Sequence, residues 1–565
     1  FNTDESIELD GEKLAFARDE AELKESWRKY LKYQTLVKLN EALDAQEKAK
    51  ENKDTIFKEK SFEELEAEAR EKVMKTQKDW FHRLSRMNNN DRLSLYINSI
   101  VGTYDPHTNY MPPNDKENFD IAISGQLEGI GATLQEKDGN IKVMSIVPGS
   151  ASWRQGQLKA GDIILKVAQG DNEPVDVVDM RLDEAIKLIR GKKGTEVRLT
   201  VKKLDGSIVV IPIIRDIVIL EETYAKSAVL QNGMKVGYIK LPQFYADFSG
   251  NGGRSCSDDV KKEIAKLKQE KIQGLILDLR NNGGGSLIDV VNMSGLFIEK
   301  GPIVQIKASQ GSPEILEDTD PSVQYDGPLV ILVNKFSASA SEILAAAMQD
   351  YKRAVIIGSP STFGKGTVQR IFDLDRFVPQ EYSAAKPIGA LKLTVQKFYR
   401  VNGGATQLKG VIPDIILPDE YAYLKMGEEE LEYPIPWDEI KPARYTPFQK
   451  AVNLEALKKN SKARVEANPT FKLINENALR LKQQNDNTNY TLNFSKHREE
   501  QKKLQAETKK YENMLKEVQG LEVFNLKSEP LPKDTALAAI TKEWHKNIKK
   551  DIYISEAISV IKDMR

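Results

Sequence analysis

Residues 329–350 read LVILVNKFSASASEILAAAMQD. The apolar run Leu329–Val333 predicts a buried strand, and the small and apolar residues that follow Ala340 predict a helix. The serine-rich turn between them places hydroxyl groups at the carboxyl end of the strand. Because the first amides of a helix can stabilise developing negative charge, this segment has the geometry expected of a nucleophile.

Strands and helices alternate from about residue 215 to 420. Further strands are predicted by short apolar runs at 236–241, 274–280 and 354–358. Helices between them are predicted by apolar spacing at 260–267 and 287–296. This alternation is typical of a largely parallel sheet covered by helices, whose active residues gather beyond the carboxyl ends of the strands. The glycine-rich loop after residue 280 and the serine turn are therefore expected to face one cleft.

The 565 residues are too many for one hydrophobic core, so several domains are expected. We divide the chain into a helical N-terminal domain (1–117), a β-rich domain (118–214), an α/β core (215–420) and a helical C-terminal domain (421–565). The fold class is therefore multi-domain, combining α+β and α/β parts. In the first domain, Ser61 and Glu64 have the spacing of a helix capping box.

The composition limits the classes of partner. The 83 basic and 84 acidic residues give a net charge of -1, which provides no overall field to attract nucleic acid or an anionic membrane. No apolar run approaches the length needed to cross a bilayer, so we expect no integral membrane segment. The single cysteine, Cys256, lacks the spacing of a metal site, and we interpret it as a thiol in a solvent-facing loop. We likewise interpret His497 and His545 as solvated helix positions.

Residues 118–214 resemble a PDZ domain in three segments: LEGIGA at 127–132, AGDIIL at 160–165 and LDEAIKLI at 182–189. Glycines beside Ile130 would let backbone amides converge on the terminal carboxylate of a peptide, which could add to the sheet as an extra strand. The resemblance implies a peptide site formed by Gly129, Ile130, Gly131, Ala132, Ile186 and Ile189. Ile186 and Ile189 fit a plain core position equally well.

A serine nucleophile needs a base, and histidine is a poor candidate here. None of the four histidines lies in the strand-helix region: they are His82, His107, His497 and His545. Lys365, between Gly364 and Gly366, is the better candidate, because a desolvated lysine can accept a proton near neutral pH. Gln369 is placed to orient its amine. The same segment does not match a phosphate-binding loop, because its glycine spacing is wrong and glycine follows the lysine.

The residues alone leave Ser337, Ser339 and Ser341 as alternative nucleophiles. If the helix begins at Ala340, Ser339 is its N-cap, and Asp350 lies 11 residues further on, close to three turns, on the same face. A capping role for Ser339 and a purely structural role for Asp350 remain alternatives.

Several motifs together resemble the tail-specific or carboxy-terminal processing protease family, over about residues 90–420. They are DPHT at 105–108, DLRNNGGG at 278–285, SASASEI at 337–343, MQDY at 348–351, TFGKGTVQ at 362–369 and KFYRVNGG at 397–404. The resemblance implies Ser339 as the nucleophile, Lys365 as the general base, Gln369 as its support and Asp350 as a residue important for activity. It also implies an oxyanion hole formed by Ala340, Gly284 and Gly285, with no cofactor and no metal.

The resemblance further implies an endopeptidase that captures flexible, apolar C-terminal tails of proteins through its PDZ domain. It suggests a bacterial periplasmic protein, with its leader removed, that acts on envelope proteins including cell-wall enzymes, with a helical-repeat adaptor as a partner. Two other functions remain open at this point. One is a PDZ-centred scaffold with an inactive protease fold, and the other is an esterase or amidase for small molecules.

Overall fold

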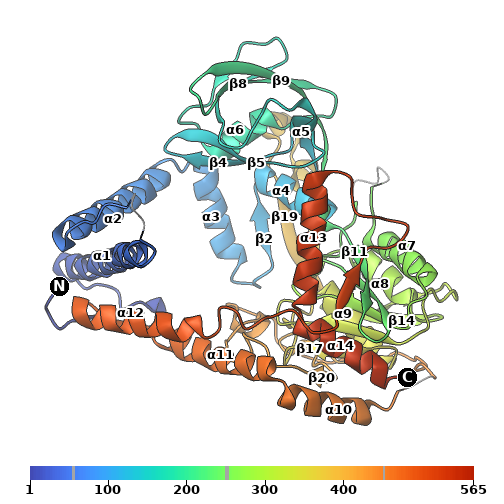
Figure 1. The fold of residues 1–565 in the computed structure, drawn as a ribbon. Helices are drawn as coiled ribbons and strands as arrows, with labels where there is room; N and C mark the ends of the chain where they lie inside the picture. Colours follow the sequence, from blue (N-terminus) through green and yellow to red (C-terminus); the bar gives the residue numbers. More distant parts are fainter. Residues whose placement is uncertain (54–56, 248–252, 450–451) are drawn as a thin grey trace. The chain divides into compact units, whose positions relative to one another are not determined.

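The computed structural model describes residues 1–53, 57–247, 253–449 and 452–565 (Figure 1). The chain forms two compact units. One unit contains Phe1–Tyr96, Asp419–Leu424 and Asn468–Lys516. The other contains Ile97–Pro418, Lys425–Ala467 and Glu517–Arg565. Each unit therefore combines segments that are far apart in the sequence.

The first unit is mainly helical. Its helices are α1 (Glu20–Glu51), α2 (Phe62–Ser85), the first part of α3 (Asn89–Val101), α11 (Pro469–Asp486) and α12 (Phe494–Lys509). The capping box predicted at Ser61 is confirmed, since the Ser61 hydroxyl accepts the Glu64 N–H and the Glu64 carboxylate accepts the Ser61 N–H. Leu39 of α1 and Leu65 of α2 are buried together with Phe494 of α12 packed against them.

The prediction that His497 is solvated is wrong. Its side chain is 1% exposed, and its Nδ1 lies 2.7 Å from Asn40 Nδ2 of α1. Burial lowers the pKa of this imidazole. The charged residues around His497 in the sequence suggested an exposed helix, but its own face packs against α1.

The core of the second unit is a seven-stranded sheet with the order β20-β17-β16-β13-β12-β11-β22. Its strands are β11 (Lys226–Gln231), β12 (Lys235–Lys240), β13 (Leu275–Asp278), β16 (Leu329–Val333), β17 (Val355–Gly358), β20 (Ile415–Ile416) and β22 (Glu522–Phe524). The neighbours from β12 to β20 are parallel, whereas β11 and β22 are antiparallel additions. The largely parallel α/β core predicted from the alternating pattern is therefore confirmed.

Three helices cover this sheet in the positions predicted from apolar spacing (Figure 1): α7 (Cys256–Gln269), α8 (Leu287–Gly295) and α9 (Ala340–Asp350). The prediction for Cys256 is wrong, because it is the first residue of α7 and is 0% exposed. Burial raises the pKa of its thiol. Cys256 lies one turn before Val260 and so extends the apolar stripe of α7 into the core.

A second sheet has the order β15-β14-β19-β18, with β2 also paired to β19. Its strands are β2 (Asn109–Met111), β14 (Gly301–Lys307), β15 (Glu314–Asp318), β18 (Thr367–Asp373) and β19 (Ala390–Tyr399). The segment 359–366 leaves β17 of the first sheet and enters β18 of the second. Lys365 is therefore on the connection between the two sheets.

The PDZ region contains a sheet of order β4-β5-β6-β8-β9, with β7 paired to β6, and two helices (Figure 1). These elements are β4 (Ala132–Lys137), β5 (Asn140–Ile146), α5 (Ala151–Gln155), β6 (Ile163–Gln169), β7 (Val175–Asp176), α6 (Leu182–Ile189), β8 (Glu196–Lys202) and β9 (Ile208–Ile214). A separate ribbon of β3 (Gln126–Gly129) and β10 (Asp216–Ile219) joins its two ends. Strand β4 is at an edge of the sheet, so its outer backbone groups are available to another strand.

The C-terminal residues of the second unit pack against the parallel sheet. They form β22, α13 (Thr535–Lys549) and α14 (Ile552–Asp563), and α10 (Leu454–Ala467) packs in turn on α14. Asp551 caps α14, and its carboxylate also accepts hydrogen bonds from the Arg280 guanidinium at 2.8 and 3.2 Å. Arg280 lies two residues after the end of β13. Across the described ranges, no helix combines the length and the apolar character that a bilayer crossing requires.

Candidate active site

The turn after β16 presents Ser339 differently from the other two serines. Ser337 and Ser341 are fully buried, and their hydroxyls donate to the backbone carbonyls of Leu279 and Asn282 at 2.8 Å. Ser339 is partly exposed at the N-cap of α9, with φ 56° and ψ −113°. This backbone conformation is unfavourable for a residue with a side chain, and such strain concentrates at functional sites.

The loop that carries Lys365 is joined to the serine turn by the carboxylate of Glu342. One oxygen of Glu342 accepts the Thr362 hydroxyl at 2.6 Å and the Gly364 N–H at 2.7 Å. The other accepts the backbone N–H groups of Ser339 at 2.7 Å and Lys365 at 3.0 Å. Glu342 is 0% exposed, so a single buried carboxylate sets the backbone of both segments.

Glu342 is the main site residue that the sequence analysis missed. Its signal was present in the sequence, because Ser339 and Glu342 have the S-x-x-E spacing of a capping box. That pattern accounts for the bond to the Ser339 N–H. The three bonds to the lysine loop, which is 20 to 23 residues away, are tertiary contacts that spacing does not reveal.

Burial changes the proton affinity of both charged groups. Burial raises the pKa of Glu342 to about 7, although Thr362 and three backbone N–H groups stabilise its charged form. Burial lowers the pKa of Lys365 to about 8, and the nearby charge of Lys392 adds to this effect. The carboxylates of Glu428, Glu342 and Asp105 act in the opposite direction. The Lys365 amine is therefore easier to deprotonate than an ordinary lysine.

The glycine loop after β13 lies directly against the serine turn. A Cβ atom on Gly284 would lie 2.7 Å from Ser339 Cβ and 3.1 Å from the Ala340 nitrogen, and Gly284 has φ +104°. At Gly285, with φ +141°, a Cβ atom would lie 2.2 Å from the Phe244 carbonyl oxygen. Glycine is thus required at both positions. The Gly284 N–H donates to Asn282 Oδ1 at 2.9 Å, so this amide is bonded within its own loop.

Asp350 lies at the opposite end of α9 from Ser339. The helix has 11 residues, so its ends are about 15 Å apart at 1.5 Å per residue. The Asp350 carboxylate accepts bonds from Arg400 at 2.6 and 3.0 Å and from Asn402 at 3.0 Å. Helical spacing places the two residues on one face, but the length of the helix keeps them apart.

The Gln369 amide is held on the second sheet. It donates to the hydroxyls of Thr367 at 2.9 Å and Thr394 at 3.1 Å, and Thr394 donates in turn to Asp105 at 2.8 Å. Within the described ranges, no hydrogen bond joins Gln369 or Asp350 to Ser339 or Lys365. The structure therefore brings together Ser339, Ala340, Gly284, Gly285 and the Lys365 loop, whereas the side chains of Asp350 and Gln369 bond to other residues.

The residues of the expected peptide site divide into core and surface positions. Ile130 and Ile189 are each 3% exposed and belong to the core of the PDZ domain. Ala132 on edge strand β4 and Ile186 on α6 are partly exposed. Gly131 has φ +77°, and a Cβ atom there would lie 2.1 Å from Ser150 Cβ. Gly129 pairs with Asp216 in the ribbon at the base of the domain.

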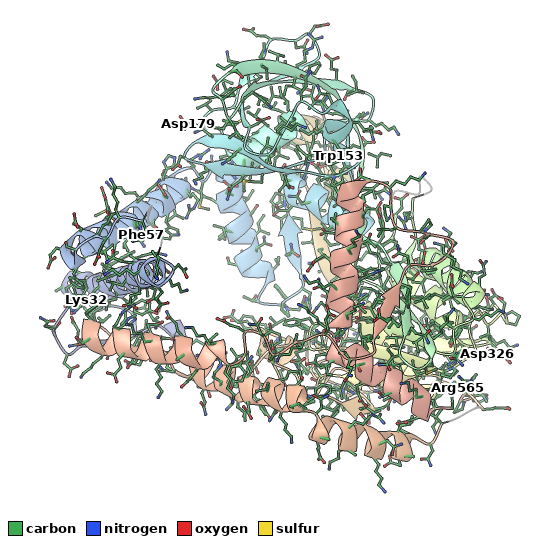
Figure 2. All side chains as sticks on the ribbon, in the orientation of Figure 1. Lys32, Phe57, Trp153, Asp179, Asp326 and Arg565 are labelled. Carbon is green, nitrogen blue, oxygen red and sulfur yellow. The ribbon has the colours of Figure 1, made fainter. Side chains whose placement is uncertain are left out.

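The loop that leads into α6 is anchored on the hairpin of β4 and β5. Asp179, labelled in Figure 2, belongs to this loop, and its N–H donates to the Gly139 carbonyl oxygen at 2.7 Å. At the start of α6, the Leu182 N–H donates to Glu136 of β4 at 3.2 Å. Helix α6 is therefore tied to the edge strand at one end.

Comparison with known families agrees with these features. The family "Peptidase family S41" matches residues 235–417, and a PDZ domain matches 120–202. The N-terminal and C-terminal domains of tail-specific protease match 1–114 and 421–565. The tail-specific protease of Haemophilus influenzae is 37% identical over 516 residues, which cover 89% of this chain and 68% of that protein. The chain belongs to the tail-specific protease family.

Two further proteins are similar to parts of this chain. The carboxy-terminal processing protease CtpA of Bacillus subtilis is 34% identical over 332 residues, covering 58% of this chain and 64% of that protein. The solved PDZ domain of a carboxy-terminal protease from Vibrio cholerae, in complex with a peptide, is 41% identical. It covers 16% of this chain and 97% of its own, with a TM-score of 0.16. Family membership makes the protein a serine-type peptidase with a PDZ domain.

Replacing Glu342 tests its role between the two loops. In Glu342→Gln, an NH2 group replaces one carboxylate oxygen and faces two donors. Each buried donor left without an acceptor costs about 1–3 kcal/mol. We expect the urea midpoint of unfolding to fall and kcat for a fluorogenic peptide to drop at least about tenfold, because the geometry of both loops changes.

Glu381→Gln, which changes an exposed glutamate of the same unit, is the matched control and should behave as the wild type. A Glu342→Gln protein with wild-type kcat and an unchanged unfolding midpoint would show that the carboxylate is dispensable.

Proposed function

We propose that this peptidase works through a dyad of Ser339 and Lys365. Ser339 Oγ attacks the carbonyl carbon of the scissile bond while the neutral Lys365 amine takes the hydroxyl proton and then gives it to the leaving amine. Water attacks the resulting acyl ester, giving its proton to Lys365, and the ester oxygen regains a proton as the carboxylate product leaves. The observation that carries this proposal is the bridging of both segments by Glu342.

The choice of Ser339 rests on its exposure and its strained backbone, since the hydroxyls of Ser337 and Ser341 are committed to backbone carbonyls. We assign the oxyanion hole to the Ala340 N–H and the glycine loop. Ala340 is the first residue of α9, so its N–H has no partner inside the helix. Gly285 is the first choice in the loop, because the Gly284 N–H already donates to Asn282.

Asp350 and Gln369 are assigned supporting roles. Asp350 binds Arg400 and Asn402 and so fixes the far end of α9 against the segment after β19. Gln369 joins Thr367 to Thr394 beside the lysine loop. Neither assignment requires contact with the reacting atoms.

The PDZ domain is proposed to capture flexible substrate tails that end in apolar residues. Support comes from the free edge of β4 and from the partly exposed apolar side chains of Ala132 and Ile186 beside it. An extended tail would pair with β4 and place its last side chain near α6. Ile130 and Ile189 would form the floor under this side chain.

We further propose a bacterial periplasmic enzyme that processes or degrades envelope proteins, including cell-wall enzymes, with a helical-repeat adaptor. The relatives described above come from bacteria, which supports the setting.

Variants of the dyad test the mechanism. Ser339→Ala and Lys365→Ala should each lower kcat/KM for protein substrates by at least about 1,000-fold, because nucleophile and base act as a unit. Lys300→Ala, on the exposed end of a loop, is the control. Normal cleavage by both dyad variants would favour a different mechanism, and hydrolysis of small esters without any cleavage of protein would favour the esterase alternative.

The pH dependence tests the base. With a Lys365 pKa of about 8, the neutral amine predominates above pH 8 and decreases about tenfold for each pH unit below it. We therefore expect kcat/KM to be lost as the pH falls, by about tenfold between pH 7 and pH 6. A flat profile from pH 8 to pH 6 would contradict a lysine base.

Paired substrates test tail selection. One unfolded protein is given either an apolar C-terminus or a C-terminus ending in two aspartates, and the apolar version should be cleaved at least about tenfold faster. Ile186→Asp should remove this difference, whereas Ile208→Asp, on the opposite edge of the PDZ sheet, should preserve it. Equal cleavage of both substrates by the wild-type enzyme would exclude selection by the tail.

A further inference from the structure

A series of hydrogen bonds between buried polar groups connects the Lys365 loop to His107. The Gly366 N–H, directly after Lys365, donates to Gln407 Oε1 at 2.7 Å. Gln407 Nε2 donates to Glu428 Oε1 at 2.9 Å. The Glu428 carboxylate in turn lies 2.8 and 3.0 Å from His107 Nε2. Gln407 and Glu428 are both 0% exposed, so these contacts are shielded from solvent.

Glu428 also contacts the lysine loop through its backbone. Its N–H donates to the Phe363 carbonyl oxygen at 3.0 Å. The preceding residue, Gly427, has φ +128°, and a Cβ atom there would lie 2.7 Å from the same oxygen. The turn that begins at Glu428 is therefore fitted closely to the loop, with its side chain directed toward Gln407 and His107.

The backbone of His107 is also held in place by hydrogen bonds. Its N–H donates to Asp105 Oδ1 at 2.8 Å, and the same oxygen accepts the Thr108 N–H at 3.1 Å and the Thr394 hydroxyl at 2.8 Å. This turn joins His107 to β19, the strand that pairs with β18 after the lysine loop. The DPHT motif thus has a defined structural task beside the proposed base.

Neither member of this pair comes from the matched peptidase domain. His107 falls within the match to the N-terminal domain (1–114), and Glu428 falls within the match to the C-terminal domain (421–565). We propose that His107 and Glu428 form a positioning pair for Lys365, supplied by the two flanking regions, and that the peptidase site is incomplete without them. This inference rests on the proposed role of Lys365 as the base.

The pair also belongs to the electrostatic surroundings of the lysine. Glu428, Glu342 on α9 and Asp105 favour the charged amine, whereas Lys392 on β19 opposes it. Removing the charge of Glu428 while keeping its size should therefore make Lys365 easier to deprotonate. Removing the His107 side chain leaves the Glu428 charge without one of its hydrogen-bond donors. This change should make Lys365 harder to deprotonate.

The experiment measures kcat and KM against pH for the full-length chain with a short fluorogenic peptide. In Glu428→Gln, we expect the acidic limb of kcat/KM to move to lower pH by roughly half a unit to one unit, with kcat reduced severalfold. In His107→Ala, the limb should move to higher pH, and His107→Gln, which keeps a donor, should restore part of the wild-type behaviour. Glu430→Gln, an exposed residue of the same turn, is the control and should match the wild type.

Folding of each variant is followed by its thermal midpoint. Wild-type limbs in both Glu428→Gln and His107→Ala would overturn the inference, as would loss of folding in both, because the pair would then be purely structural. Lys365→Ala separates this result from failure of the proposed function. If Lys365→Ala keeps its activity, the base assignment fails, whereas an inactive Lys365→Ala with unshifted limbs in the other variants rejects the pair alone.

Discussion

A single buried carboxylate determines the relative position of the two segments that carry the chemistry. Glu342 has no solvent exposure, and the four donors that surround it stabilise its charged form and offset part of the cost of burial. Two of these donors belong to the backbone of Ser339 and Lys365 themselves. The geometry of the site is therefore stabilised at the level of the main chain, before either reactive side chain is considered.

This arrangement also explains why the lysine loop needs support from several directions. The loop connects β17 of the parallel sheet to β18 of the second sheet, so movement of either sheet displaces it. Glu342 accepts hydrogen bonds from the loop on the side of the serine turn. On the other side, the loop is bonded to Gln407, which is linked through Glu428 to His107. The backbone around Lys365 is thereby hydrogen-bonded on both sides while the amine itself remains in a desolvated environment, where its proton affinity is lowered.

The sequence was a good guide wherever structure depends on local pattern. The apolar run Leu329–Val333, the helix that begins at Ala340 and the capping box at Ser61 all formed as predicted, because periodicity and capping act over a few residues. Burial was harder to predict. Cys256 and His497 were assigned to solvent, yet each lies on the buried face of a helix, and which face packs inward is decided by distant segments.

In the candidate active site, too, local features were predictable from the sequence and long-range side-chain contacts were not. The close approach of Gly284 to Ser339 fits the expectation that the two loops share a cleft. Counting helical turns placed Asp350 on the same face of α9 as Ser339, and such a count gives the face of a helix but not the distance along its axis. The contacts of Glu342 with the lysine loop and of Glu428 with Gln407 were not predicted, because these partners are 20 or more residues away and follow no spacing rule.

Strand β22 carries a consequence for the order in which the protein is made. It pairs with β11 and occupies one edge of the parallel sheet, although it is formed by residues Glu522–Phe524, near the end of the chain. During synthesis, about 290 residues are added between β11 and this strand, and β11 is an open edge for all of that time. Open edges pair readily with other chains. Until β22 emerges, the nascent chain therefore exposes β11 as an unpaired edge, and it is vulnerable to aggregation during that time.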